Sequence, residues 1–118
     1  MRSTASWIDQ FFACALIAVG VAHLVTGLSI LTSVTEGWIW FMGTGVAALA
    51  VGALNLARRW HGRDGWALRA LCLVVNLILL AVVLAYAATF AERLTWQVVA
   101  IPAIVLAASA FALNDALR

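Results

Sequence analysis

Two side chains with hydrogen-bonding chemistry interrupt stretches of sequence that are otherwise apolar. They are His23, in "VGVAHLVTG" (19–27), and Asn76, in "LVVNLIL" (73–79). An imidazole exchanges a proton near neutral pH, and an amide both donates and accepts hydrogen bonds. Because a polar group surrounded by lipid is costly, such residues face other helices or cavities and often mark functional sites. His23 with Asn76 is therefore the first candidate for a ligand-binding pair, and the plainer interpretation is an interhelical hydrogen bond.

The composition is typical of a membrane domain. The chain has 118 residues, of which 66% are hydrophobic and 10% are charged, with a formal net charge of +2. A soluble domain carries about 25% charged residues. The basic stretch "RRWHGRDG" (58–65) is too short for the clustered basic face of a nucleic-acid-binding protein, so no nucleic-acid partner is expected. We interpret residues 1–118 as one transmembrane domain whose surroundings are the lipid bilayer.

Four apolar runs define the expected membrane spans, at 11–33, 38–57, 67–90 and 96–117. A helix needs about 20 residues to cross a hydrocarbon core of about 30 Å. A lone strand would leave its backbone groups unpaired in lipid, so each span is predicted to be a helix. The sequence thus predicts an all-α integral membrane four-helix bundle with up-down-up-down topology.

Arginines indicate the orientation of this bundle. In the four-span arrangement only Arg93 falls on one side, whereas the other side holds Arg2, Arg58, Arg59, Arg63, Arg69 and Arg118. By the positive-inside rule both termini are cytoplasmic. For a bacterial-type cell this predicts a multi-pass protein of the inner (plasma) membrane.

Small residues recur at helical spacing and predict the packing faces. They are Gly20 and Gly27 in the first span, Gly45 and Gly52 in the second, and Ala103 and Ala107 in the fourth. Small side chains let membrane helices approach closely. The same faces carry His23, Asn55 and Asn114, and Asn76 lies on the corresponding face of the third span. By depth, His23 and Asn76 are expected near the bilayer midplane, with Asn55 and Asn114 near the cytoplasmic ends.

The residue types do not favour a bound cofactor or metal ion. A b-type haem needs an axial imidazole, and His61 lies in a loop, so haem would require His23 from two copies of the chain. No metal site is predicted, because four suitable ligands do not converge. Cys14 and Cys72 lie inside apolar runs and are interpreted as small buried hydrophobes.

The residue types also argue against catalysis. No nucleophilic triad, metalloprotease motif or phosphate loop is present, so no catalytic residue is predicted. The expected function is a non-enzymatic membrane protein whose polar midplane site, His23 with Asn76, binds a lipid-like or quinone-like ligand. The alternative is a homo-oligomeric channel or transporter, or an accessory subunit of a membrane complex, in which the polar residues line a pore or bridge helices.

Overall fold

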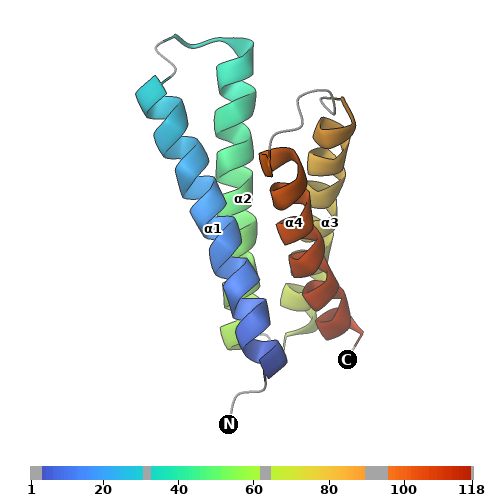
Figure 1. Cartoon of the computed structure of the whole chain (residues 1–118). Helices are drawn as coiled ribbons and strands as arrows, with labels where there is room; N and C mark the ends of the chain where they lie inside the picture. Colours follow the sequence, from blue (N-terminus) through green and yellow to red (C-terminus); the bar gives the residue numbers. More distant parts are fainter. Residues whose placement is uncertain (1–3, 31–32, 62–64, 90–95, 118) are drawn as a thin grey trace.

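The computed structural model of the chain describes residues 4–30, 33–61, 65–89 and 96–117. These residues form four helices: α1 (Thr4–Ile30), α2 (Glu36–His61), α3 (Trp66–Thr89) and α4 (Trp96–Ala116) (Figure 1). Strands are absent from these ranges. Each helix contains a stretch that is long and apolar enough to cross a membrane. The prediction of an all-α protein with four membrane-length helices is confirmed.

Local signals fix the limits of α2. Thr35 precedes the helix, and its Oγ1 accepts a hydrogen bond from the backbone N–H of Trp38 at 3.2 Å. This is the usual role of a threonine at a helix N-cap. Glu36 lies in the first turn, and Arg58, Arg59 and His61 lie in the last. Both placements complement the partial charges at the helix ends.

Glycines bring α1 and α2 into close contact. A Cβ added to Gly20 would lie 2.6 Å from the backbone N of Leu49, and one added to Gly45 would lie 2.8 Å from the Cβ of His23. Gly52 is equally tight against α1, because its Cβ would lie 2.9 Å from the carbonyl oxygen of Ala13. At the other end of the same contact, Trp38 Nε1 donates a hydrogen bond to the carbonyl of Gly27 at 3.0 Å.

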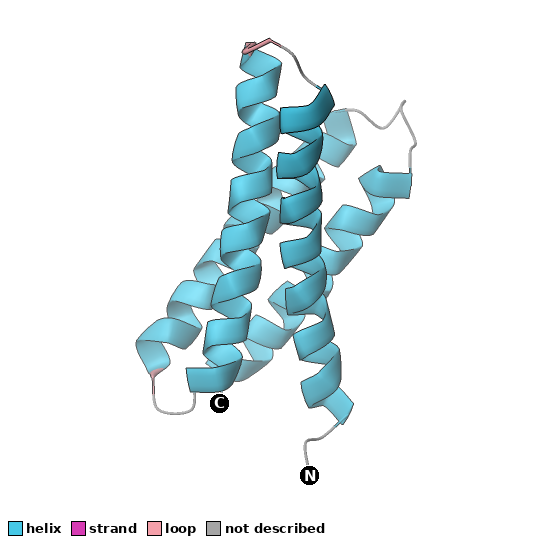
Figure 2. Cartoon of the chain, turned by 90° about the vertical axis from the view of Figure 1, so that its left-hand side faces the viewer, coloured by secondary structure: helices cyan, strands magenta, loops and turns pink. Residues whose placement is uncertain are grey.

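The α1–α2 pair and the α3–α4 pair lie side by side, with α1 against α4 and α2 against α3 (Figures 1 and 2). The start of α1 and the end of α4 lie at the same end of the molecule (Figure 1). Large apolar side chains from all four helices form the core, namely Leu16, Val51, Leu79, Val83, Val105 and Ala108.

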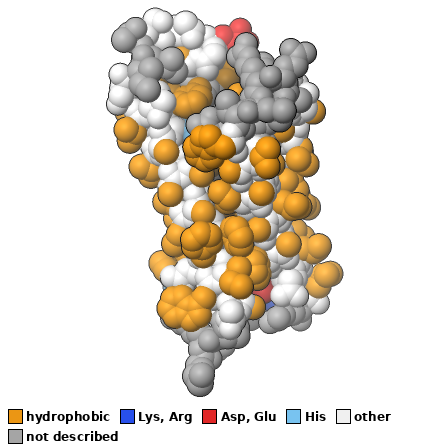
Figure 3. Space-filling view, in the orientation of Figure 1, with side chains coloured by type: hydrophobic (Ala, Val, Ile, Leu, Met, Phe, Trp, Pro, Cys, Tyr) orange, Lys and Arg blue, Asp and Glu red, His pale blue; other side chains and the backbone are white. Residues whose placement is uncertain are grey.

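The outer surface of the bundle is apolar. Phe11, Leu28 and Leu106 are more than half exposed, and hydrophobic side chains cover the length of the visible face (Figure 3). The molecule measures 46 × 26 × 25 Å, and a bilayer with its headgroup regions is about 40–45 Å thick. Five exposed tryptophans lie near helix ends: Trp7, Trp40, Trp60, Trp66 and Trp96. This surface suits contact with lipid and its two interfaces.

Helix α4 presents a different face to the bundle from the one expected. Ala103 is exposed and Ala107 is only partly buried, whereas Val105, Ala108 and Ala112 are buried. The physical reason is that α4 is apolar on every side, so its sequence does not define one inward face. The core takes the face whose larger Val105 side chain fills the space between the helices.

Candidate functional site

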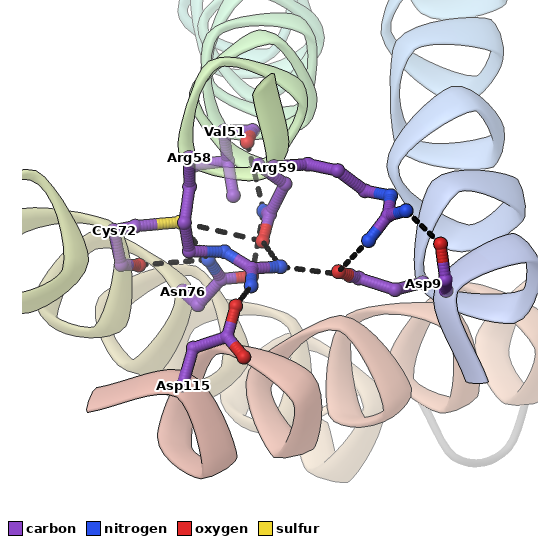
Figure 4. A network of polar contacts seen from close by, with 9 residues as sticks. Asp9, Val51, Arg58, Arg59, Cys72, Asn76 and Asp115 are labelled. Carbon is purple, nitrogen blue, oxygen red and sulfur yellow. Dashed lines mark hydrogen bonds and ion pairs between the residues drawn. The ribbon is translucent and has the colours of Figure 1, made fainter. Parts of the chain in front are cut away.

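A fully buried arginine lies at the centre of the polar interior. The Arg58 side chain is 0% exposed, and its Nη2 donates to Asp9 Oδ1 at 2.7 Å. Its Nη1 donates to Asp115 Oδ2. Asp9 belongs to α1 and Asp115 to α4, so three helices meet at one guanidinium (Figure 4). Burying a charge is tolerated when it is paired and hydrogen-bonded, as it is here.

An amide–thiol network continues from Arg58 into α3. Asn55 Nδ2 donates to Asn76 Oδ1 at 3.2 Å and to the carbonyl of Val51 at 2.9 Å. Asn76 Nδ2 in turn donates to the carbonyl of Cys72 at 2.7 Å, and Cys72 Sγ donates to Asn55 Oδ1 at 3.3 Å. Asn55 and Asn76 are buried. We call these residues the Arg58 cluster, and they come from all four helices: Asp9, Asn55, Arg58, Cys72, Asn76 and Asp115.

Two further arginines flank the Arg58 cluster. Arg59 donates to Ser6 Oγ, and its Nη1 lies 3.9 Å from Asp9 Oδ2. Arg69 Nη1 donates to the backbone carbonyl of Asp115 at 3.3 Å. Within the described residues, the buried Nε atoms of Arg58, Arg59 and Arg69 have no hydrogen-bond partner.

His23 and Asn76 do not form one site. The His23 ring lies against α2, stacked on Phe41 with ring centroids 4.6 Å apart, and its Nδ1 is 3.1 Å from the carbonyl oxygen of Val19. His23 therefore packs beside Gly45, whereas Asn76 bonds to Asn55. Gly45 and Asn55 are separated along α2 by about 15 Å, at 1.5 Å per residue. The helices are offset along their axes so that Asn76 meets the last third of α2.

Asn114 also lies apart from the other candidates. It is exposed on α4, and it is the next residue, Asp115, that reaches Arg58. Of the four polar candidates, the structure joins Asn55 to Asn76, places His23 on the α1–α2 contact and leaves Asn114 on the outside.

The sequence interpretation missed the charged half of the Arg58 cluster. The sequence pattern gives Arg58 a role only in the positive-inside distribution, and it gives no role to Asp9 or Asp115. A signal was present, because the face of Gly52 and Asn55 continues at the next i+3 step to Arg58. Helix α1 also begins at Thr4, before the expected span, and so carries Asp9 inside the bundle.

A lateral groove runs between α2 and α3, with a volume of about 260 Å³. Its walls are almost wholly apolar, and they are formed by Thr44, Ala47, Ala50, Val51, Leu54, Val75, Ile78, Leu79 and Val82. The one hydroxyl among them, that of Thr44, donates to the carbonyl of Trp40 in its own helix at 2.8 Å. Leu54 lies one helical turn from Arg58, so the groove ends close to the Arg58 cluster.

The described residues bring together no group of three or more His, Cys, Asp or Glu side chains that would hold a metal ion. The polar network also does not extend through the bundle, because Leu16, Leu79 and Val83 belong to an apolar core beyond Asn76. Searches with protein-family models, against curated proteins and against solved structures found no match to the chain.

Proposed function

We propose that this chain is a non-enzymatic, multi-pass protein of the inner membrane that binds a lipid-like ligand, with the hydrocarbon chain of the ligand in the α2–α3 groove. The helices cross the bilayer in up-down-up-down order, and both termini are cytoplasmic. The distribution of arginines along the sequence supports this orientation. The groove replaces the His23–Asn76 pair as the ligand site.

The apolar lining of the groove is the observation that carries this proposal. A ligand that needed hydrogen-bond donors would find none free on these walls, because the single hydroxyl, that of Thr44, already donates to the carbonyl of Trp40. The volume of about 260 Å³ is below the roughly 300–1,000 Å³ of pockets for drug-sized ligands. A flexible chain fits this space better than a substituted ring system. The chain of a phospholipid and the tail of a quinone-like molecule both meet that description.

Filling the groove tests the proposal. Ala50 lines the groove, whereas Ala53 is exposed on α2 and does not line it. We expect Ala50→Phe to abolish crosslinking of a phospholipid that carries a photoreactive group in its acyl chain, and to remove the lipid mass retained in native mass spectrometry. Ala53→Phe, which adds the same bulk elsewhere on α2, should leave both signals unchanged. Equal crosslinking of the two variants at the groove residues would contradict the proposal.

A second candidate function, an oligomeric channel or transporter, rests on His23. Within the described helices its ring makes one hydrogen bond, through Nδ1, which leaves Nε2 available to a transported ion or to another copy of the chain. Because the interior is closed by the apolar core, the path would run between copies. Proteoliposome flux that is lost in His23→Leu would support this function. Flux that is absent or independent of His23 would exclude it.

A further inference from the structure

The arginines at the Arg58 end of the bundle offer more hydrogen-bond donors than the described residues accept. Arg58, Arg59 and Arg69 each keep a buried Nε–H without a partner. A buried donor that stays unpaired costs free energy, because it has lost its bond to water. The three donors lie at one end of the bundle: Arg58 and Arg59 approach the carboxylate of Asp9, Arg58 also bonds to the carboxylate of Asp115, and Arg69 bonds to the backbone carbonyl of Asp115.

The charges of this region indicate which type of group would pair with the free Nε–H donors. Among the described side chains that make these contacts, Arg58 and Arg59 pair with the carboxylates of Asp9 and Asp115, whereas Arg69 bonds only to a backbone carbonyl. The three guanidinium groups therefore exceed the two carboxylates by one positive charge. The Arg58 side chain is 0% exposed, whereas that of Arg59 is 19% exposed and that of Asp115 is 32% exposed. Arg59 can therefore be reached from outside, as can Arg69, which is half-buried, whereas Arg58 cannot.

We propose that this end of the bundle binds a phosphate-class anion, held by Arg59 and Arg69 and supported by the buried charge of Arg58. Guanidinium groups bind phosphate oxygens through two parallel N–H donors. Basic pockets between helices on the cytoplasmic side of membranes bind anionic lipid headgroups in this way.

The position of the groove favours a lipid phosphate over free phosphate. Leu54, at the end of the groove, precedes Arg58 by one turn of α2, and the exposed Trp60 and Trp66 mark the same end as the bilayer interface. A lipid with its chain in the groove would place its headgroup at the end of the bundle that carries the arginines. This step rests on the proposed function, whereas the anion site itself stands on the arginines alone.

Native mass spectrometry of the full chain tests the site with phosphatidylglycerol and phosphatidylcholine of identical acyl chains. We expect phosphatidylglycerol to bind in preference. The double variant Arg59→Gln/Arg69→Gln should weaken that binding about tenfold or more, because hydrogen bonds to charged groups are worth about one decade each in affinity. Arg93→Gln, which removes one positive charge, serves as the control for position; it lies outside the described residues and is assigned by sequence to the opposite side. It should leave the preference unchanged.

Inorganic phosphate distinguishes the two sources of the anion. Displacement of phosphatidylglycerol only at high excess identifies a lipid headgroup site, whereas binding of phosphate itself, lost in the double variant, identifies a site for the free anion. Equal binding of both lipids and no phosphate binding would overturn the proposal. Ala50→Phe separates the groove from the anion site, since it should reduce binding of both lipids alike and leave phosphate binding intact.

Thermal unfolding of each variant checks that the bundle survives the loss of charge. If the glutamine variant fails to fold, Arg59→Lys/Arg69→Lys keeps the charge and removes the bidentate geometry. It should retain the preference for phosphatidylglycerol with reduced affinity. Unchanged affinity for both lipids in that folded variant would also contradict the site.

Discussion

The contact within the α1–α2 pair and the contact between the two helix pairs are built by different means. Within the pair, Gly20, Gly45 and Gly52 let the two backbones touch along most of the contact. Charged side chains take part at one end of it, where Arg58 and Arg59 meet Asp9. Between the pairs, Arg58 joins α2 to α4 through an ion pair with Asp115, and Asn55 joins α2 to α3 through an amide hydrogen bond. The contact within the pair depends mainly on close packing of the backbones, and the contact between the pairs depends on hydrogen-bond geometry and charge. The two should therefore fail differently when they are altered.

Removal of the Arg58 side chain should lower the free energy of unfolding more than any other change proposed here. Arg58→Met keeps much of the side-chain volume but leaves the carboxylates of Asp9 and Asp115 without their shared partner. Breaking a buried ion pair from one side costs about 3–5 kcal/mol. Reversible unfolding in mixed micelles would measure this cost.

The control for Arg58→Met is the triple variant Asp9→Asn/Arg58→Met/Asp115→Asn, which removes all three charges. It should recover much of the lost stability, because a neutral interior has no unpaired ion. A cost below about 1 kcal/mol for Arg58→Met alone would show that the ion pairs are not fully desolvated.

A substitution in the tight contact within the α1–α2 pair should cause the next largest loss of stability. In Gly20→Ala the new Cβ would meet backbone atoms, 2.6 Å from Leu49 N and 2.7 Å from the carbonyl oxygen of Gly45. The helices must separate to admit it, and overpacking of this kind costs about 1–3 kcal/mol.

Gly43→Ala provides the matched control, because a Cβ there meets nothing within 4 Å. That substitution should change the free energy of unfolding by less than about 0.5 kcal/mol, as other surface changes do. Equal effects of the two substitutions, measured by the same unfolding assay, would mean that the pair is not held by close backbone contact.

Asn55 and Asn114, each in the last third of its helix, offer the comparison with the smallest expected difference in stability. Asn55→Leu removes the hydrogen bond to Asn76 and leaves the Cys72 thiol without its acceptor. Interhelical hydrogen bonds of this kind are worth roughly 0.6 kcal/mol, with an upper range near 2. Asn114→Leu, on the exposed face of α4, should be neutral or slightly stabilising in lipid. A larger loss for Asn114→Leu would place that face in an interface with another protein chain.

How far the site could be predicted differs from residue to residue. Asn55 and Asn76 were recognisable, because a lone amide in an apolar span has few other roles than to face another helix. Asp9, Arg58 and Asp115 were not recognised, because charges near span ends are ordinarily solvated at the interface. Only the packing shows that Arg58 turns inward and that the two carboxylates come from helices far apart in the sequence.

The sequence by itself determined the four membrane-length helices, because run length and hydropathy depend on neighbouring residues alone. It also indicated the close approach of α1 and α2, since small residues two helical turns apart leave a groove on any helix. The tertiary structure alone decided that Asn76 meets Asn55 and not His23, and that α4 turns Val105 inward and not Ala103. Both outcomes depend on how the helices are shifted and rotated against one another. In helices that are apolar on every side, the fit of the whole core sets that shift and rotation, and no single segment encodes it.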